Sequence, residues 1–297
     1  MTPPTISVLL PVRNGLATLG AAISSVLNQS FDDFELLVLD DGSDDGTPDY
    51  VRGLKDPRIR LFQDGVKRGL ATRLNQGIDN ARGRYLARMD ADDISFPTRF
   101  AQQVAALDAQ PEIDLLGCRA VVFHDDGSII GLLPYAGSHA QLCARPWRNI
   151  PLPHPTWMGR AEWFRRHHYK HPEALRAEDQ ELLLRSLDSS HFACLDKILL
   201  GYRQTSFRLG VTLQGRRSLL TAQIRIFAAR KQWGNIAAAA LLTGFKSIID
   251  IAAALPHCQH LYFMRMSGAV PPDAAQILRN LLGHPGMATY STEKAAR

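Results

Sequence analysis

Residues 5–12 have the sequence TISVLLPV, a short apolar run that ends in the polar turn Arg13-Asn14-Gly15. A run of this length and composition, bounded by a glycine-containing turn, is typical of a buried β-strand. The apolar residues that follow recur at helical spacing: Leu16, Leu19, Ile23, Val26 and Leu27. The chain therefore opens with a strand, a turn and a helix.

The same alternation continues to about residue 93. Three further runs predict strands, at residues 35–40, 58–63 and 84–90, and helical patterns occupy residues 47–54 and 69–81. Strands that alternate with helices through short turns predict an α/β fold with a doubly wound, mostly parallel sheet. Ligands bind such sheets at the carboxyl ends of the strands. Two of these ends carry aspartates, Asp40 and Asp90.

The second half of the chain has a different organisation. It contains predicted strands at residues 113–123, 128–133 and 192–202, a short helix at 178–187, and helical patterns from residue 214 onward. Residues 201–297 hold 12 Lys and Arg against three acids, whereas the whole chain has a net charge of +5. We therefore divide the chain into an α/β domain, residues 1–210, and a basic helical C-terminal extension, residues 211–297.

Composition excludes several classes of protein. With 297 residues, of which 45% are hydrophobic, the chain can bury a large core and is not a disordered protein. The four cysteines form no Cys-x-x-Cys pair, so neither a zinc site nor a disulfide framework is expected. The first residues lack the basic and apolar regions of a signal peptide, and we expect a cytoplasmic protein. Neither phosphate-binding glycine motif, Gly-x-x-x-x-Gly-Lys nor Gly-x-Gly-x-x-Gly, is present.

An acidic motif, Asp90-Ala91-Asp92-Asp93, follows the predicted strand at residues 84–90. Carboxylates at positions i and i+2 of an extended backbone point to the same side. Such a pair suits Mg²⁺ or Mn²⁺, which bridge to substrate phosphates. The alternative is a solvated acidic turn that begins the next helix.

Two other polar motifs are ambiguous when taken alone. The stretch at residues 40–47, DDGSDDGT, would either contact a base or a ribose or form an Asx-rich turn. It is not an EF-hand calcium loop, because Arg52 stands at the twelfth position from Asp41, where such a loop needs glutamate. The acidic pair Glu178-Asp179 begins a predicted helix. It either complements the helix dipole or supplies a general base.

Taken together, these motifs resemble the family-2 inverting glycosyltransferases of the GT-A fold. The resemblance rests on an ordered series of segments that covers about residues 5–205: TISVLLPVRN at 5–14, VLDDGSDDGT at 38–47, the stretch 68–83, RYLARMDADD at 84–93, HPTWM at 154–158, and AED through Arg185 at 177–185. The fold class that it implies is an α/β sheet of GT-A type with a helical C-terminal extension.

The resemblance also implies roles for individual residues. Pro11, Arg13 and Asp41 would line the nucleoside pocket, with Asp40 a weaker candidate, and Arg68 would assist at the diphosphate. Asp90 would hold the ribose or the metal, while Asp92 and Asp93 would bind Mn²⁺ or Mg²⁺. Asp179 would be the general base of a single displacement. The donor would be a nucleoside-diphosphate sugar, with UDP- or dTDP-sugars favoured, and the acceptor a saccharide or lipid-linked saccharide in cell-surface polysaccharide or glycolipid assembly.

Two other classes of function stay open at this stage. A sugar nucleotidyltransferase shares the acidic metal ligands, but it would need a glycine-rich basic loop that Arg13-Asn14-Gly15 does not provide. A non-catalytic nucleotide-sugar-binding scaffold would need neither Asp92 nor Asp179. No nucleic-acid-binding module is recognised in the basic extension, so nucleic acid is not an expected partner.

Residues 235–255 form an apolar stretch long enough to cross a bilayer, but Lys246 and Asp250 interrupt it. We predict that the extension holds the protein at an anionic membrane surface, peripherally on the cytoplasmic face of the inner membrane. Basic residues upstream would meet the headgroups: Arg216, Arg217, Arg225, Arg230 and Lys231. The alternative is a helix that packs its apolar face on the α/β domain.

Overall fold

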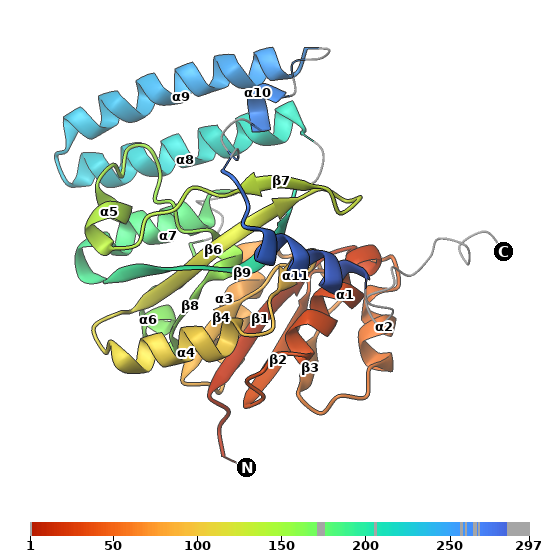
Figure 1. Cartoon of the computed structure of the whole chain (residues 1–297). Helices are drawn as coiled ribbons and strands as arrows, with labels where there is room; N and C mark the ends of the chain where they lie inside the picture. The colour runs from red at the N-terminus through yellow and green to blue at the C-terminus, as the bar shows by residue number, and fades with distance from the viewer. Residues whose placement is uncertain are drawn as a thin grey trace.

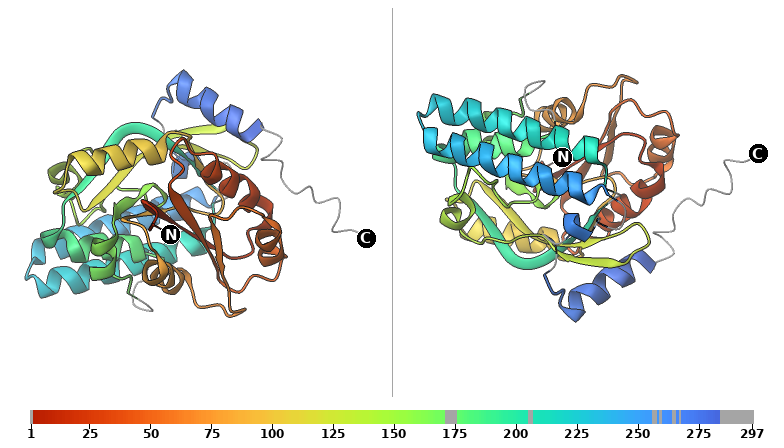
Figure 2. Two further views of the ribbon diagram at one scale, coloured as in Figure 1. Left: turned by 90° about the horizontal axis from the view of Figure 1, so that it is seen from below. Right: turned by 90° about the horizontal axis from the view of Figure 1, so that it is seen from above.

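The computed structural model describes residues 2–170, 176–204, 207–255, 258, 260–263, 266 and 268–283. Nine strands form one sheet with helices on both faces (Figures 1 and 2). The strands are β1 (Ile6–Val12), β2 (Phe34–Asp40), β3 (Ile59–Phe62), β4 (Tyr85–Arg88), β5 (Ile94–Ser95), β6 (Leu115–Phe123), β7 (Ile129–Leu132), β8 (Met158–Arg160) and β9 (Phe192–Arg203).

The helices are α1 (Leu16–Leu27), α2 (Thr47–Gly53), α3 (Leu70–Asn80), α4 (Arg99–Ala109), α5 (His139–Cys143), α6 (Ala161–Arg166), α7 (Glu178–Ser186), α8 (Leu209–Ala229), α9 (Trp233–Ala253), α10 (His260–Phe263) and α11 (Pro272–Gly283), with 3-10 turns η1 (His154–Thr156) and η2 (Leu187–Ser189). The helices expected at residues 16–27, 47–54, 69–81 and 178–187 are present, and α5 and α6 were not predicted.

The sheet has the strand order β3-β2-β1-β4-β8-β6-β9-β5, and β7 pairs with β6. The α/β class is confirmed, but the predicted excess of parallel pairing holds only for the first half of the chain. β1, β2, β3 and β4 pair in parallel. Beyond β4 the sheet is mixed, because β8 runs antiparallel to both β4 and β6 while β6 and β9 are parallel. β8 is only three residues long, and it joins the two halves of the sheet.

β1 is buried on both faces, which explains its continuous apolar sequence. Ile6, Val8 and Leu10 pack in one core cluster, which also contains residues of α1, α2 and α4. Leu9 belongs to the other cluster, on the opposite face, together with residues of α3, α6, α7 and α8. β1 is therefore the centre of a three-layer structure, and its carboxyl end lies beside the end of β2, since Val12 pairs with Asp40.

The C-terminal elements are attached to this core rather than separate from it. α8 places Phe227 in the second cluster, and Arg225 pairs with Glu181 of α7 at 2.9 Å. α11 returns to the sheet, where Leu278 packs with Phe123 of β6. α9 forms the outermost layer, on top of α8 (Figure 1). The division at residue 210 falls at the start of α8 and stays a prediction; residues 284–297 lie outside the described residues.

We expect Gly77 to be essential for the packing of α3 on the sheet. A Cβ at this position would lie 2.7 Å from Leu39 Cδ1 and 2.9 Å from Leu9 Cδ2. Gly77→Ala should therefore lower the free energy of unfolding by about 1–3 kcal/mol, the usual cost of overpacking, despite the better helix propensity of alanine.

Urea denaturation measures this difference, and Gly244→Ala in α9 is the matched control. A Cβ at Gly244 meets nothing within 4 Å, so this variant should be neutral or more stable by up to about 1 kcal/mol. Equal effects of the two substitutions would contradict the packing argument.

Candidate active site

Three carboxylates gather where β4 ends. Oxygen atoms of Asp90, Asp92 and Asp93 all lie within 4.8 Å of one another. Arg203, at the end of β9, fixes this turn: its backbone N–H donates to Asp93 Oδ1 at 2.8 Å, and its Nε donates to the Asp92 carbonyl at 2.8 Å. The structure therefore brings together Asp92 and Asp93, the predicted metal ligands, and Asp90, which was predicted to hold the ribose or the metal.

Arg88, the last residue of β4, is the buried cation of this cluster. Its side chain is 5% exposed and forms an ion pair with Asp90. Its Nη1 makes this ion pair, and its Nε is buried without a hydrogen-bond partner. Burial by itself lowers the pKa of this guanidinium, but Asp90 and Asp93 raise it by more, so Arg88 stays charged. Sequence reasoning did not select Arg88; the one signal is a charged residue within an otherwise buried strand.

Two of the three acids have raised pKa values. Burial, followed by the charge of Asp90, raises the pKa of Asp92 to about 6. Burial, followed by the charges of Asp90 and Asp92, raises the pKa of Asp93 well above its usual range. The Asp93 Oδ2 atom is buried and has no hydrogen-bond partner. Hard oxygen donors that lack compensating charge fit Mg²⁺ or Mn²⁺, which Asp90, Asp92 and Asp93 would hold together.

A second acidic pair faces the same space from α7. Glu178 and Asp179 are half-buried at the start of this helix. Burial, then the charge of Asp179, raises the pKa of Glu178 to about 7, while Arg88 lowers it. Burial also raises the pKa of Asp179, and Arg88 again opposes the shift. Both carboxylates therefore lie within electrostatic reach of Arg88, and the role of Asp179 as general base stays a prediction.

Neighbouring side chains hold the start of α7 in place. Gln180 makes two hydrogen bonds with the backbone of Ile150, at 2.9 and 3.1 Å.

His154 Nε2 lies 2.7 Å from the hydroxyl of Tyr169, and both residues are buried. Asn75 fixes Tyr169 through two bonds to its backbone, at 2.8 and 2.9 Å. Burial, with help from Arg88, lowers the pKa of His154 well below its usual range, so this imidazole is neutral.

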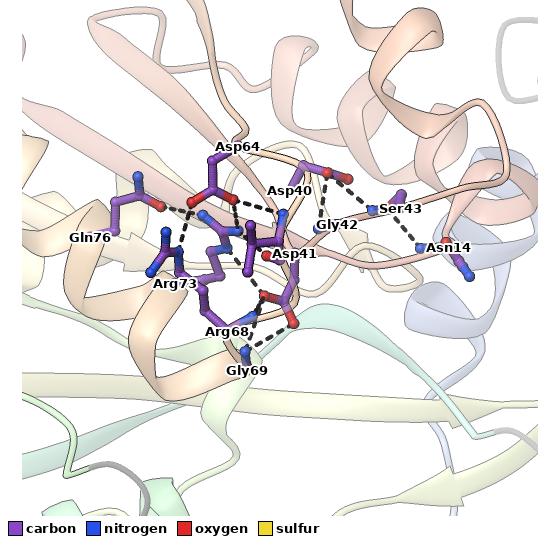
Figure 3. Close-up of polar contacts among 11 residues, drawn as sticks. Asn14, Asp40, Asp41, Gly42, Ser43, Asp64, Arg68, Gly69, Arg73 and Gln76 are labelled. Atoms are coloured by element: carbon purple, nitrogen blue, oxygen red, sulfur yellow. Dashed lines mark hydrogen bonds and ion pairs between the residues drawn. The ribbon is translucent and has the colours of Figure 1, made fainter.

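Asp41, which was predicted to contact the base, is hydrogen-bonded to the start of α3. Its Oδ1 accepts hydrogen bonds from the backbone N–H groups of Arg68 at 2.6 Å and Gly69 at 3.0 Å, and from Arg73 Nε at 3.2 Å (Figure 3). Asp41 thus binds the residues that begin α3, where free backbone N–H groups favour a carboxylate. The carboxylate is already engaged in the protein, which leaves its predicted contact with a base as a hypothesis.

Arg73 is the centre of this network. It is fully buried and also binds Asp64, the Val66 carbonyl at 2.5 Å and Gln76 at 3.0 Å (Figure 3). It was not selected from the sequence. The available signal was its place on the apolar stripe of α3, since Leu70, Arg73, Leu74 and Gly77 follow the i, i+3, i+4, i+7 pattern.

The other predicted nucleoside-site residues lie around this network. Asp40 is buried and accepts from the N–H groups of Gly42 and Ser43, both at 3.1 Å, while its Oδ1 has no partner. Arg68 directs its Nε to Asp64 at 2.6 Å. Pro11 is buried in β1 and Arg13 is exposed directly after it.

Asn14 ties the loop after β1 to the loop after β2. Its backbone N–H donates to Ser43 Oγ at 2.9 Å, and its side-chain amide exchanges bonds with Asp44 at 2.8 and 3.0 Å. Together these contacts make a pre-formed edge beside the acidic cluster.

Comparison with known proteins gives this geometry a context. Residues 7–169 match the family model described as glycosyl transferase family 2. EpsE of Bacillus subtilis, which carries a glycosyltransferase name, is 35% identical over 170 residues, or 54% of this chain and 58% of EpsE. WfgD of Escherichia coli, named a UDP-Glc:α-D-GlcNAc-diphosphoundecaprenol β-1,3-glucosyltransferase, is 36% identical over 102 residues, covering 34% of this chain and 40% of WfgD. The matched segments thus span less than two thirds of these relatives.

Solved structures share the fold at low identity. TarS of S. aureus, residues 1–349 with UDP-GlcNAc, superimposes with a TM-score of 0.58 at 16% identity, over 95% of this chain and 80% of that one. A mannosyltransferase from Pyrobaculum calidifontis with GDP-Man and Mn²⁺ gives a TM-score of 0.55 at 16% identity, over 93% and 86% of the two chains.

Removal of the buried cation should destabilise the protein in a pH-dependent way. In Arg88→Met the folded-state pKa values of the surrounding carboxyls rise, so the folded state binds more protons than the unfolded state. Its stability must then fall as pH rises. We expect the deficit relative to wild type to grow from about pH 5 to pH 8, toward the 3–5 kcal/mol that breaking a buried pair costs.

Chemical denaturation in EDTA measures this deficit. Arg84→Met is the control, since Arg84 precedes β4 and its pair with Asp108 is exposed, at 58% and 44%. An exposed pair contributes about 0–1 kcal/mol, with little change over this range. A deficit in Arg88→Met that does not depend on pH would show that Arg88 acts through packing alone.

Proposed function

The chain belongs to glycosyl transferase family 2 and has a fold of the GT-A type, and from this premise we propose that it is an inverting, metal-dependent glycosyltransferase. The observation that carries the proposal is the convergence of two acidic groups on one buried arginine. Asp90 pairs with Arg88 and clusters with Asp92 and Asp93 at the end of β4, and the charge of Arg88 lowers the pKa of Glu178 and Asp179 at the start of α7. Membership of this family also disfavours a sugar nucleotidyltransferase. A non-catalytic nucleotide-sugar-binding scaffold would not need two acidic groups around one buried arginine.

In the proposed reaction a sugar moves from a nucleoside diphosphate to an acceptor hydroxyl. Asp179 accepts the proton of that hydroxyl, and the oxygen attacks the anomeric carbon from the face opposite the leaving group. The bond to the diphosphate breaks, and the configuration at the anomeric carbon inverts. Mn²⁺ or Mg²⁺, held by Asp92 with Asp90 and Asp93, would stabilise the charge that develops on the leaving diphosphate.

Residues of this chain orient both substrates. We place the nucleoside against Pro11, Arg13, Asp40 and Asp41, with Arg68 near the diphosphate. The connection of the loops after β1 and β2 supports this placement, because it holds that edge in one geometry before the donor arrives. The bonds of Gln180 to Ile150 position Asp179 in the same way.

We propose a UDP-sugar as donor, with dTDP-sugars as the second choice, and a lipid-linked saccharide as acceptor in polysaccharide or glycolipid assembly. The complexes of TarS with UDP-GlcNAc and the name of WfgD support this choice, although GDP-Man in the mannosyltransferase shows that the fold also accepts a purine nucleotide. An acceptor on a lipid carrier would place the enzyme peripherally on the cytoplasmic face of the inner membrane.

Donor binding should depend on a divalent cation held by Asp92. Calorimetry with UDP should show tighter binding in Mn²⁺ than in EDTA for wild type. Asp92→Ala should lose at least the 10- to 100-fold in metal affinity that even an outer-shell change costs. Asp49→Ala removes an aspartate whose side chain is 82% exposed and should behave as wild type. Wild-type binding that is the same in EDTA would exclude the metal.

Asp179 should carry the proton transfer. Asp179→Asn keeps the shape of the side chain but removes the proton acceptor, so turnover should fall about 10²–10⁴-fold with UDP binding unchanged. Mass spectrometry of the nucleotide sugars consumed by the wild-type protein, with water as acceptor, gives the rate. Glu178→Gln is the matched control and should cost less. If Glu178→Gln proves the more damaging variant, Glu178 is the base.

A further inference from the structure

α9 exposes its apolar side chains and buries its polar ones. Five large apolar residues of this helix, and Leu255 just after it, are between 53% and 77% exposed: Trp233, Leu241, Phe245, Ile248 and Ile251. The other exposed positions of the helix, Gly234, Ala237, Ala240 and Gly244, are also non-polar. The exposed face of α9 is therefore apolar along the whole helix, the opposite of the pattern of a helix on a water-soluble surface.

The polar side of α9 faces α8. Asp250 is 2% exposed and pairs with Arg216 of α8, whose Nη2 donates to Asp250 Oδ1 at 2.9 Å. Asn235, Thr243 and Ser247 are at most partly exposed. Because this pairing fixes the rotation of α9 on α8, the apolar face cannot turn inward without breaking the ion pair and leaving Arg216, whose side chain is 17% exposed, without its carboxylate. The alternative from the sequence, in which the apolar face packs on the α/β domain, is wrong.

Charge around this face is positive. Asp250 is the one acid in residues 208–255, and it is buried, so the outer surface of the α8–α9 hairpin carries no carboxylate. Three of the arginines that we expected to meet headgroups are paired within the protein instead: Arg216 with Asp250, Arg225 with Glu181 and Arg230 with Asp188. Arg217 and Lys231 are exposed.

We propose that the exposed face of α9, residues 233–255, inserts its apolar side chains into the interfacial layer of a lipid bilayer, and that this insertion rather than headgroup charge provides most of the binding. The apolar stripe carries no carboxylate and is bordered by cations. It would therefore fit the boundary between acyl chains and headgroups, with its cations beside the lipid phosphates. A second copy of this chain fits less well, since two hairpins face to face would bring their cations together.

α9 lies in the membrane surface and does not cross it. The helix is long and apolar enough to span a bilayer. However, α8 lies along its whole length, and a crossing hairpin would take Arg216, Arg217 and Arg225 into the hydrocarbon, where charged side chains are costly. The hairpin would therefore lie flat on the membrane, with the α/β domain, which lies beneath α8 and α9 in the view from above (Figure 2, right), on the water side. This inference deepens the proposed membrane location, but it does not depend on glycosyl transfer.

Vesicle binding by the full chain tests the insertion. We expect co-sedimentation with phosphatidylcholine vesicles alone, moderately stronger binding when phosphatidylglycerol is added, and persistence in about 1 M salt, where the Debye length falls to about 3 Å. Trp233 reports insertion directly, since its fluorescence should shift to the blue. Trp157 and Trp163 are already buried, and Trp147 is partly buried against the second core cluster, so a large blue shift reports Trp233.

A paired variant separates this face from general charge effects. Leu241→Glu with Phe245→Glu should reduce the partition coefficient at least about 30-fold, because two charges would enter the interface. Ala105→Glu with Ala109→Glu, on exposed positions of α4, is the matched control and should bind as wild type. UDP binding measured on the same samples shows whether the active site is intact, so a failure of attachment is distinguishable from a failure of the proposed function.

Three results would overturn the proposal. Binding that requires phosphatidylglycerol and disappears in high salt would leave attachment to charge alone. A dimer in light scattering that the Leu241→Glu, Phe245→Glu variant dissociates, with no vesicle binding by wild type, would identify a second copy as the occupant of this face. Protein that stays in the cell's membrane fraction after extraction with alkaline carbonate would mean that α9 spans the membrane.

Discussion

Five carboxylates converge on one region of this protein, and the placement of a positive charge among them is the constraint on which the site depends. Like charges at this distance cannot all ionise without compensation. Arg88 supplies one charge from the end of β4, where burial keeps water from screening it. Burial, and after it the charge of a neighbouring acid, still raises the pKa of Asp92 to about 6 and that of Glu178 to about 7, so this single charge does not compensate the buried acids. A divalent cation would supply the missing positive charge at Asp90, Asp92 and Asp93. A substrate hydroxyl would give its proton to Asp179, so the proposed chemistry agrees with the charge balance of the site.

Two other buried arginines hold the frame around this site. Arg99 donates to the Arg88 carbonyl at 2.8 Å and to Gln103 at 3.0 Å, and burial lowers its pKa to about 10. Gln103 in turn binds the carbonyls of Leu116 and Thr156. Arg73 performs the equivalent task between α3 and the loop after β2. In each case a fork of N–H donors satisfies backbone carbonyls or carboxylates that would otherwise be buried unpaired. These residues position the site without reaching its reacting atoms.

The same pairing of opposite charges directs α9 outward. Asp250 and Arg216 sit between α8 and α9, so the ion pair occupies the position that an apolar contact would have in an ordinary helical hairpin. The large apolar side chains of α9 are left exposed. In Figure 1, α9 lies beyond α8 as seen from the sheet. Catalysis at the carboxyl edge of the sheet and attachment through the outer helix would then use separate surfaces of one chain, which lets each be altered without the other.

The sequence by itself determined the α/β class, the order of the elements up to about residue 93, the family and the acidic motif at residues 90–93, because apolar periodicity and short motifs are local properties of the chain. It also selected Glu178-Asp179, but only the fold could show that this pair lies near residues about ninety positions earlier. Arg73, Arg88 and Arg99 escaped notice because a buried arginine has no local signature; its role depends on carbonyls and carboxylates that distant segments supply. Tertiary contacts likewise decided three other features, since each results from a pairing between segments far apart in the chain. These are the hydrogen bonds of Asp41 to the start of α3, the antiparallel pairing of β8 with β4, and the outward orientation of the apolar face of α9.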